Sequence, residues 1–257
     1  MIAKRTIAAS LPPLSFDSVV GRANNFTNRD RTETFGRLIM GEVGRLHGTA
    51  RVLDVGCGQG LSVNDGHGSS ALAAIRMGVG ELWGCEPDPD VVPNPLLHQF
   101  VRGTLEDAEL PEGYFDLVYA HLVVEHVTDP LAFLAKAFRV LKPSGRLLFI
   151  TPNERHYFVK VARVVAALQL EEAILNIIHK GAAEAHYPTK YLLNGEKAIM
   201  RASRDVGFRT AVFAYFEHGD VRSYFHPLVR WIPTALERVM RFAGYNRLPG
   251  LVARLER

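Results

Sequence analysis

The sequence predicts an α/β fold in which a mostly parallel β-sheet is covered by helices on both faces. Short apolar runs alternate with helical patterns between residues 51 and 151, which is typical of strand–helix–strand units. A glycine-rich stretch, "GCGQG" (56–60), directly follows the first apolar run, where the chain must turn. Hydrophobic residues make up 47% and charged residues 22% of the 257 residues, so the chain can bury a sizeable core.

Five apolar runs in the first 151 residues are predicted to be strands. Each is short and is bounded by glycine, proline or polar residues, as expected of strands buried in a parallel sheet. In chain order they are residues 51–55, 81–85, 99–103, 114–120 and 146–151.

The clearest helix is predicted over residues 129–141. Asp129 can cap it, Pro130 suits its first turn, and apolar residues recur three and four positions apart. Residues 69–78 also have helical spacing and stop at a glycine. Residues 88–97 contain three prolines, so any helix there should be short or broken.

The second part of the chain is richer in helical patterns. Residues 155–180 form one long amphipathic pattern whose charged residues argue against a membrane span. A helix ending at Gly207, a strand, a further helix and a last strand should follow. Residues 186–208 should form a turn and then the helix that ends at Gly207, and the other three elements cover residues 208–216, 228–243 and 249–257. We expect a single domain, 1–257, with an N-terminal helical segment, a core, a helical insertion and substrate-side elements: 1–50, 51–153, 154–185 and 186–257.

Charge and cysteine content exclude some classes of protein. The net charge of +3 is too small to imply nucleic-acid binding. Residues 222–257 hold seven arginines, two glutamates and no lysine, so this segment could meet an anionic substrate or a membrane surface, or form a solvated helix face. Two cysteines are too few for a disulfide scaffold, and the N-terminus lacks the apolar region of a signal peptide. We therefore expect a cytoplasmic protein.

The glycine stretch indicates a ligand that approaches the main chain closely. Gly56, Gly58 and Gly60 follow a buried strand, and ligands of parallel sheets bind beyond the carboxyl ends of the strands. A P-loop would need a lysine that is absent here, and the dinucleotide fingerprint would need glycine where Leu61 stands. The ligand is therefore expected to be a nucleotide-like cofactor of another kind.

Two acidic residues narrow the ligand further. Asp54 stands two residues before the first glycine, where a carboxylate suits an ammonium group better than a pyrophosphate. Glu86 directly follows the second strand, where an acid accepts hydrogen bonds from a ribose diol. An amino-acid end, a ribose and no phosphate describe S-adenosylmethionine (SAM).

Four segments then resemble a known family. They are "VLDVGCGQG", "GCEPD", "LEDAELPEGYFDLVYAHLVVEHVTDP" and "FRVLKPSGRLLFITPN". In this order they resemble class I SAM-dependent methyltransferases that act on small molecules. The resemblance covers residues 50–153 closely and residues 186–216 loosely, and it implies a Rossmann-like, seven-stranded, mostly parallel sheet with added helices.

The resemblance also implies a cofactor pocket. Around the methionine part of SAM it places Asp54, Gly56, Cys57, Gly58 and Gly60. It places Glu86 on the ribose hydroxyls, with Pro87 beside the adenine and Leu105 and Glu106 along the adenine edge. Finally, it directs Ala120 and His121, which follow the fourth strand, toward the sulfonium and the acceptor.

The chain departs from the family after the third glycine. In relatives a helix begins there, whereas here "LSVNDGHGSS" intervenes. Residues 64–70 are expected to be a loop, which either forms a flap over the cofactor and helps to bind the acceptor, through His67 for example, or is a tolerated surface insertion.

Several side chains are candidates for the chemistry. A hydroxyl acceptor must lose a proton, and His121 could be its general base or could only hydrogen-bond the cofactor. Glu125 is expected to orient a neighbour or to cap backbone groups, and His126 of the "EHV" segment is a candidate acceptor contact or a structural residue. His186 and Tyr187 are further acceptor candidates. The spacing of His121, Glu125 and His126 matches no familiar metal site, so we expect no metal.

The sequence thus predicts an enzyme that methylates a hydroxyl of a small or medium-sized acceptor. The acceptor could be a sugar or glycolipid, a quinone-like ring or another natural product. Two alternatives stay open, namely a SAM-binding protein without turnover and a methyltransferase of protein or RNA. A homodimer through residues 155–180 also stays open. Nucleic acid is disfavoured because "AHLVVEHV" stands where base-amine methyltransferases carry Asn/Asp-Pro-Pro-Tyr/Phe.

Overall fold

A computed structural model gives the fold of the chain. It describes residues 12–20, 23–24, 31–46, 48–61, 66–157, 159–161, 163, 188–216, 231–242 and 248–257. Residues 66–70 are described by their backbone alone.

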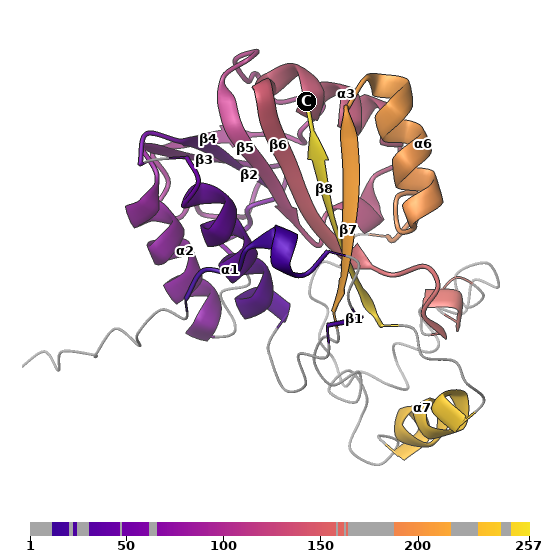
Figure 1. The fold of residues 1–257 in the computed structure, drawn as a ribbon. Helices are drawn as coiled ribbons and strands as arrows, with labels where there is room; N and C mark the ends of the chain where they lie inside the picture. The colour runs from indigo at the N-terminus through magenta and orange to yellow at the C-terminus, as the bar shows by residue number, and fades with distance from the viewer. Residues whose placement is uncertain are drawn as a thin grey trace, which may run out of the picture.

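One β-sheet forms the centre of the molecule (Figure 1). Its strand order is β1-β7-β8-β6-β5-β2-β3-β4. The bounds are β1 Ala23–Asn24, β2 Arg51–Val55, β3 Glu81–Glu86, β4 Gln99–Arg102, β5 Phe115–His121, β6 Leu141–Pro152, β7 Thr210–Phe216 and β8 Gly250–Glu256. Only β8 runs antiparallel to its neighbours β6 and β7. The expected seven-stranded, mostly parallel sheet is confirmed, and the two-residue β1 extends its edge.

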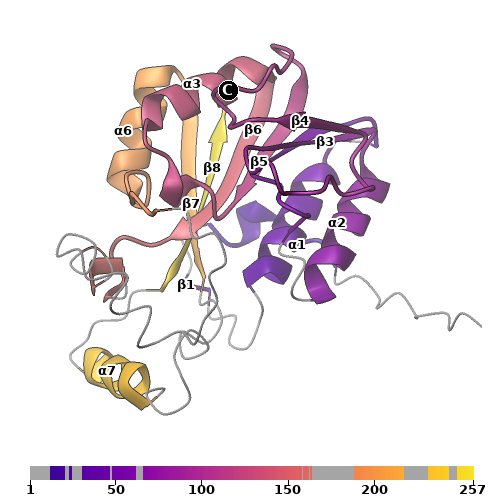
Figure 2. The same ribbon diagram turned by 180° about the vertical axis from the view of Figure 1, so that it is seen from behind.

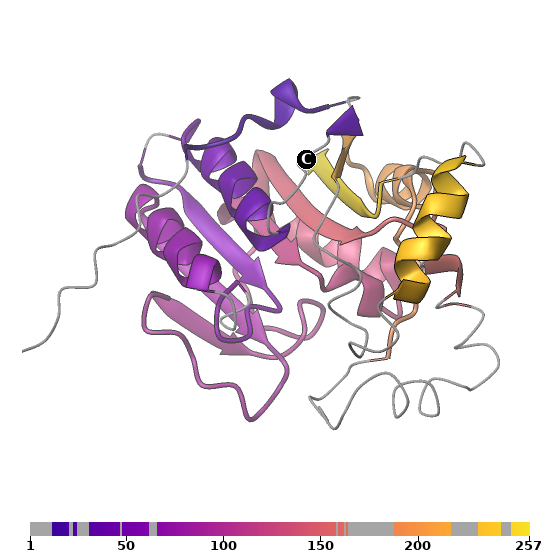
Figure 3. The same cartoon turned by 90° about the horizontal axis from the view of Figure 1, so that it is seen from below.

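Helices cover both faces of the sheet. Figures 1 and 2 show α1 (Arg31–Val43) and α2 (Gly66–Gly78) together on one face, and α3 (Pro130–Val140) and α6 (Glu196–Val206) together on the other. The helix α7 (Trp231–Phe242) stands beyond one end of the sheet, the end opposite the C-terminus (Figures 1 and 3). Because β8 runs antiparallel and ends at the C-terminus, the carboxyl ends of β6 and β7 lie at the end near α7.

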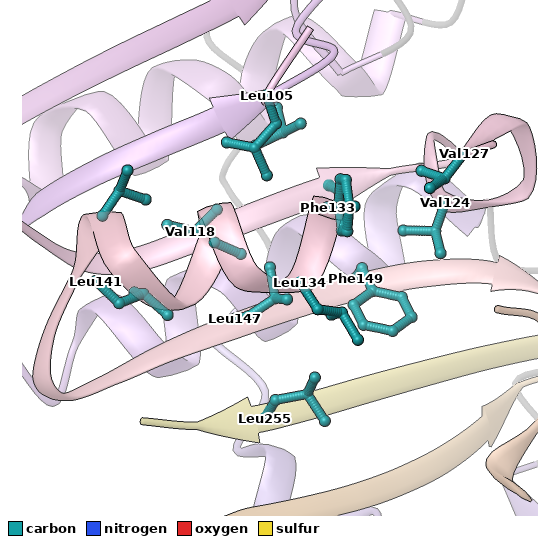
Figure 4. Packing of buried hydrophobic residues seen from close by; sticks show 14 of the residues in the cluster. Leu105, Val118, Val124, Val127, Phe133, Leu134, Leu141, Leu147, Phe149 and Leu255 are labelled. Atoms are coloured by element: carbon teal, nitrogen blue, oxygen red, sulfur yellow. The ribbon is translucent and has the colours of Figure 1, made fainter. Parts of the chain in front are cut away.

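The core is divided by the sheet into two clusters. Because side chains alternate along a strand, β5 sends Val118 and Ala120 to the α3 side and Leu117 and Tyr119 to the α1 side. Figure 4 shows the α3-side cluster, in which Phe133 of α3 packs over the strands. Each fully buried valine, leucine or phenylalanine side chain contributes roughly 1.5–3 kcal/mol to folding.

The helix ends follow the sequence signals. The Asp129 carboxylate accepts hydrogen bonds from the backbone N–H groups of Leu131 and Ala132, both at 3.0 Å, and thus caps α3. Gly207 ends α6 with a left-handed φ of 110°, which lets its N–H bond back to the last turn. Both helices are therefore confirmed at the predicted positions.

The segment after the glycine stretch differs from the expectation. Helix α2 begins at Gly66, three residues before the predicted start, so residues 66–70 are helical and not loop. The prediction of a loop over 64–70 was wrong for these residues, because helix formation simply extends one turn back through a glycine-containing sequence that contains no proline. Residues 62–65 lie outside the described part.

Two further segments are described more fully than the sequence allowed. Residues 88–97 contain no helix, as their three prolines suggested. Strand β6 begins at Leu141, ahead of the predicted residue 146, and residues 142–145 form an irregularity in its pairing with β5. The predicted long helix over 155–180 is described only for residues 155–157, 159–161 and 163, and residue 157 and the later ones are helical.

Within the described ranges, no helix combines the length and the apolar character that crossing a membrane requires.

Candidate functional site

The glycine loop at the carboxyl end of β2 is held by neighbouring backbone. The N–H groups of Gly56 and Cys57 both donate to the Cys85 carbonyl of β3, at 2.9 and 3.1 Å. Gly56 has a φ of +62°, and a Cβ there would lie 2.4 Å from a methyl group of Val123. Gly58 has a φ of +50°, and a Cβ there would meet nothing described within 4 Å. The loop is thus packed at its base and open at Gly58, where a ligand can approach the main chain.

Glu86 organises this loop. Its carboxylate accepts a hydrogen bond from the Gly58 N–H at 2.9 Å and another from the Asp88 N–H at 3.0 Å. The side chain is 6% exposed. A carboxylate has about four lone-pair sites, so two remain for further donors such as ribose hydroxyls.

Asp54 is the exception among the buried acids of the site. Its side chain is 2% exposed, and among the described residues its Oδ2 atom has no hydrogen-bond partner. Burial raises the pKa of this carboxyl to about 8, against the influence of the Tyr119 hydroxyl. A buried carboxyl group with an unpaired oxygen next to an open glycine loop fits a ligand that brings a cation.

His121 lies at the carboxyl end of β5, on the same side of the sheet as Tyr119 because the two are two residues apart. Its ring centroid is 5.6 Å from that of Phe35 on α1. Tyr119 pairs in register with Asp54, so Asp54, Tyr119 and His121 line one side of the neighbouring strands β2 and β5. His121 is therefore on the same side of the sheet as Asp54, at the carboxyl end of the neighbouring strand.

The residues expected beside the adenine and the sulfonium differ in how deeply they are buried. Pro87 is exposed, and Glu106 is half-buried, with a pKa that burial raises. Leu105 and Ala120 belong to the α3-side cluster, with 2% and 0% of their surfaces exposed. Their side chains therefore pack in the core, and they can border a ligand mainly through their backbone.

The two cysteines of the site are free thiols. Burial raises the pKa of the Cys85 thiol to about 12 and that of the Cys57 thiol above its ordinary range. Both thiols are thus neutral and unreactive near neutral pH. Cys57 instead fills space, because a Cβ on the neighbouring Gly84 would lie 2.7 Å from its Sγ.

A second polar network lies at the ends of β5 and β6. The Thr151 hydroxyl donates to the Glu125 carboxylate at 3.3 Å, and the Asn194 side chain donates to Thr151 at 2.7 Å. The Glu125 carbonyl accepts the N–H groups of Lys190 and Tyr191. Burial raises the pKa of the Glu125 carboxyl to about 7, with Arg31 and Thr151 acting in the opposite direction.

Sequence reasoning found only one member of this network. Of the two roles expected of Glu125, its carboxylate contact with Thr151 fits the orienting of a neighbour, whereas the Lys190 and Tyr191 N–H groups bond its main-chain carbonyl and not its side chain. Thr151 and Asn194 were not singled out. The one available signal was the position of Thr151 as a polar residue at the end of an apolar strand.

The remaining histidine candidates are placed in part. The Nδ1 atom of His126 lies 3.3 Å from the Pro188 carbonyl oxygen, so its ring contacts the segment that leads to α6. His67 lies in the first turn of α2, and nothing is described of its side chain. His186 and Tyr187 lie outside the described residues. In the part of the chain that is described, no three His, Cys, Asp or Glu residues gather as metal ligands would.

Comparison with known proteins shows which proteins the core and the fold of this chain resemble. Residues 53–149 match the family described as a methyltransferase domain. A putative methyltransferase from Haloferax volcanii, solved with the Trm112 activator, has a TM-score of 0.53 at 19% identity, covering 84% of this chain and 86% of that one. A SAM-dependent methyltransferase from Thermotoga maritima, described as a possible histamine N-methyltransferase, has a TM-score of 0.52 at 17% identity, covering 85% and 86%. Residues 53–149 are therefore similar to a methyltransferase domain, and the chain has the fold of SAM-dependent methyltransferases.

The names of curated relatives indicate a more specific reaction than the family description does. A ubiquinone biosynthesis O-methyltransferase from Thiobacillus denitrificans is 31% identical over 170 residues, which are 62% of this chain and 65% of the relative. The protein of the same name from Hahella chejuensis is 32% identical over 163 residues, 61% of this chain and 62% of the relative. The chain thus spans somewhat less than two thirds of the length of these relatives.

Proposed function

We propose that the protein is an O-methyltransferase that transfers the methyl group of SAM to a hydroxyl of a small or medium-sized acceptor. The observation that carries the proposal is the buried, unpaired Asp54 beside the open Gly58, with Glu86 on the next strand and His121 at the end of β5. We treat residues 1–257 as a single domain that serves this reaction.

The residues of the glycine loop would hold the cofactor. Asp54 would pair with its ammonium group, and Gly56, Cys57, Gly58 and Gly60 would surround its methionine part. The free lone pairs of Glu86 would accept the ribose hydroxyls. This assignment leaves no phosphate to place against two carboxylates, which supports a phosphate-free nucleoside. The adenine would lie toward Pro87, Leu105 and Glu106, and Ala120 would border the sulfonium.

Methyl transfer mainly requires the protein to align the acceptor with the methyl group of the cofactor. When bound, SAM supplies a methyl group on a sulfonium, which leaves as a neutral thioether. Holding the acceptor oxygen in line with that methyl group can lower the barrier by roughly 7–11 kcal/mol. His121 would accept the hydroxyl proton as the new carbon–oxygen bond forms, a contribution of about 10²–10⁴-fold. His67, His126, His186 and Tyr187 remain proposals for contacts with the acceptor.

Among the acceptors that the sequence left open, we favour a quinone-like ring. The support is the name shared by the curated relatives, ubiquinone biosynthesis O-methyltransferase. The exposed apolar residues of α7, with Trp231 at 67% and Phe242 at 97% exposure, support contact of the basic C-terminal segment with a membrane surface or an anionic acceptor. The proposal includes neither a nucleic-acid partner nor a metal. A homodimer through residues 155–180 is proposed as well. The free thiols support a cytoplasmic location.

Binding and turnover test the proposal separately. Titration calorimetry with SAM should show binding that is at least about tenfold weaker in Asp54→Ala and Glu86→Ala. Asp90→Ala is the matched control, because this exposed acid lies just beyond the same strand. Unchanged affinity in both site variants would defeat the pocket assignment. A library of phenolic, sugar and lipid acceptors with labelled SAM would then identify the acceptor, and binding without labelling of any of them would favour a SAM-binding protein without turnover.

A further inference from the structure

Asp54 and Tyr119 form an incomplete pair in the structure. They are in-register neighbours on β2 and β5, and both side chains lie on the α1 side of the sheet. Asp54 is 2% and Tyr119 0% exposed. Within the described residues, the Asp54 Oδ2 and the Tyr119 hydroxyl make no hydrogen bond of good geometry, but the Tyr119 hydroxyl lies close enough to the Asp54 carboxyl to act as a donor that lowers its pKa. A buried carboxyl oxygen that lacks a well-formed hydrogen bond is costly, and such a cost points to a missing ligand.

The packing around Tyr119 fixes the position of its ring. Phe35 of α1 packs edge-on against it, with 6.4 Å between ring centroids and 73° between ring planes. The ring belongs to the α1-side cluster, with Leu117 and Leu148 on the neighbouring positions of the sheet. These apolar contacts therefore hold the hydroxyl beside Asp54.

We propose that Tyr119 is a positioning residue that acts through Asp54, and that binding of the cofactor's ammonium group expels a proton which Asp54 holds in the ligand-free protein. This inference rests on the proposed function, in which Asp54 is the ammonium site. The proton leaves the Asp54 carboxyl for the solvent, and the resulting carboxylate accepts hydrogen bonds from the ammonium group and from the Tyr119 hydroxyl. No other group changes its charge.

The electrostatic surroundings support this order of events. The pKa of Asp54 is raised to about 8, mainly by burial and in part by Glu86 on β3, against the Tyr119 hydroxyl, which lowers it. The other titratable neighbours are Cys57 on the glycine loop and Cys85 on β3, whose thiols stay neutral. The two side chains named as acting on the Asp54 carboxyl are Tyr119 and Glu86, and neither is a cation. The arriving ammonium is thus the charge that makes the ionised form favourable.

Calorimetry in two buffers measures the proton directly. The probe is S-adenosylhomocysteine, which carries the same ammonium and ribose, titrated into the full chain at pH 6.5 in buffers of low and high ionisation enthalpy. At this pH a carboxyl with a pKa of about 8 is almost fully protonated, whereas the ligand's α-amino group is almost fully charged. We expect release of about 0.9 proton per ligand bound, and a Kd that rises about tenfold from pH 7 to pH 6.

Three variants assign the effect to residues. Asp54→Asn should bind weakly, with no proton released and with no dependence on pH between 6 and 7. Tyr119→Phe should weaken binding about tenfold at pH 6.5 and move the pH dependence of Kd to higher pH, because the carboxylate loses a donor. A purely structural role of Tyr119 would weaken binding equally at every pH. His121→Gln should still release the proton, which separates Asp54 from the nearest histidine of the site.

The outcomes distinguish this inference from the proposed function. Tight binding to Asp54→Asn would overturn both. Weak binding to Asp54→Asn, together with release of less than about 0.2 proton by the unmodified protein, would leave the cofactor site in place and overturn the inference. The measurement on the unmodified protein decides this point even if a variant fails to fold. A Tyr119→Phe variant with an unshifted pH profile would remove Tyr119 from the inference.

Discussion

Replacing Asp54 with asparagine should stabilise the ligand-free protein, and the gain should grow as the pH rises. Burial raises the pKa of Asp54 to about 8, whereas the pKa of an unfolded aspartic acid is about 3.9. The folded state therefore holds a proton that the unfolded chain releases. The contribution of this group to the free energy of unfolding is fully present below about pH 4 and is lost as the pH rises through 8.

The size of the effect follows from the two pKa values. Each unit of pKa difference corresponds to about 1.4 kcal/mol, so the unmodified protein should lose about 3 kcal/mol through Asp54 between pH 5 and pH 8. Asparagine has no proton to release and avoids this loss. For a chain of this size, the difference in Tm between variant and unmodified protein should widen by about 6–12 °C over the same pH range.

Urea unfolding at pH 5, 6, 7 and 8 would measure the effect. The fluorescence of Trp83 on β3, whose ring packs against those of Tyr114 and Phe115, reports on the sheet. Asp90→Asn is the control, because this exposed acid should leave the pH dependence unchanged. Parallel stability curves for the unmodified protein and Asp54→Asn would refute the reasoning, since they would show that the proton affinity of Asp54 does not change on folding.

Three more predictions concern chemistry, stability and surface contact. His121→Ala should lower kcat on a hydroxyl acceptor by about 10²–10⁴-fold with little change in the Kd of S-adenosylhomocysteine; a loss below tenfold would move the base elsewhere. Glu125→Gln should stabilise the protein by about 3 kcal/mol at pH 8 but not at pH 4, because the raised pKa of about 7 makes the acid costly once it ionises; an equal effect at both pH values would contradict this. Replacing Trp231 and Phe242 with glutamate should weaken sedimentation with anionic vesicles at least about tenfold, while neutral vesicles serve as the control and equal binding by the variant would exclude α7 as the contact.

The elements of the core fold were predictable because their signals are local. Apolar runs bounded by turn residues placed the five strands, and Asp129 with Pro130 marked the start of α3. The start of α2 was missed, because a glycine-containing stretch gives no sharp local boundary. The two-residue β1 was missed for a different reason, since such a short strand exists only through its pairing with β7 at the edge of the sheet.

The parts of the site that consist of residues close together in the sequence were predictable. Contacts that depend on how strands pair in the sheet were not. The glycine loop and its two acids can be recognised from the order of residues in the sequence. The pairing of Asp54 with Tyr119 depends on strands that are neighbours in the sheet but are separated along the chain by β3 and β4. The contact of Glu125 with Thr151 similarly requires that two strand ends meet. Such partners follow from topology, which no local pattern encodes.

The three buried acids of the site differ in what they can still bind. Glu86 is occupied on both oxygens by backbone N–H groups, and Glu125 accepts the Thr151 hydroxyl. Of these three acids, only Asp54 has a buried oxygen without a hydrogen-bond partner in the described part of the chain. A cation placed at Glu86 would compete with the bonds that shape the glycine loop, whereas a cation at Asp54 relieves an existing cost. The distribution of hydrogen bonds therefore favours Asp54 for the ammonium group and Glu86 for the uncharged ribose hydroxyls, and the reverse assignment would disrupt the loop that the cofactor needs.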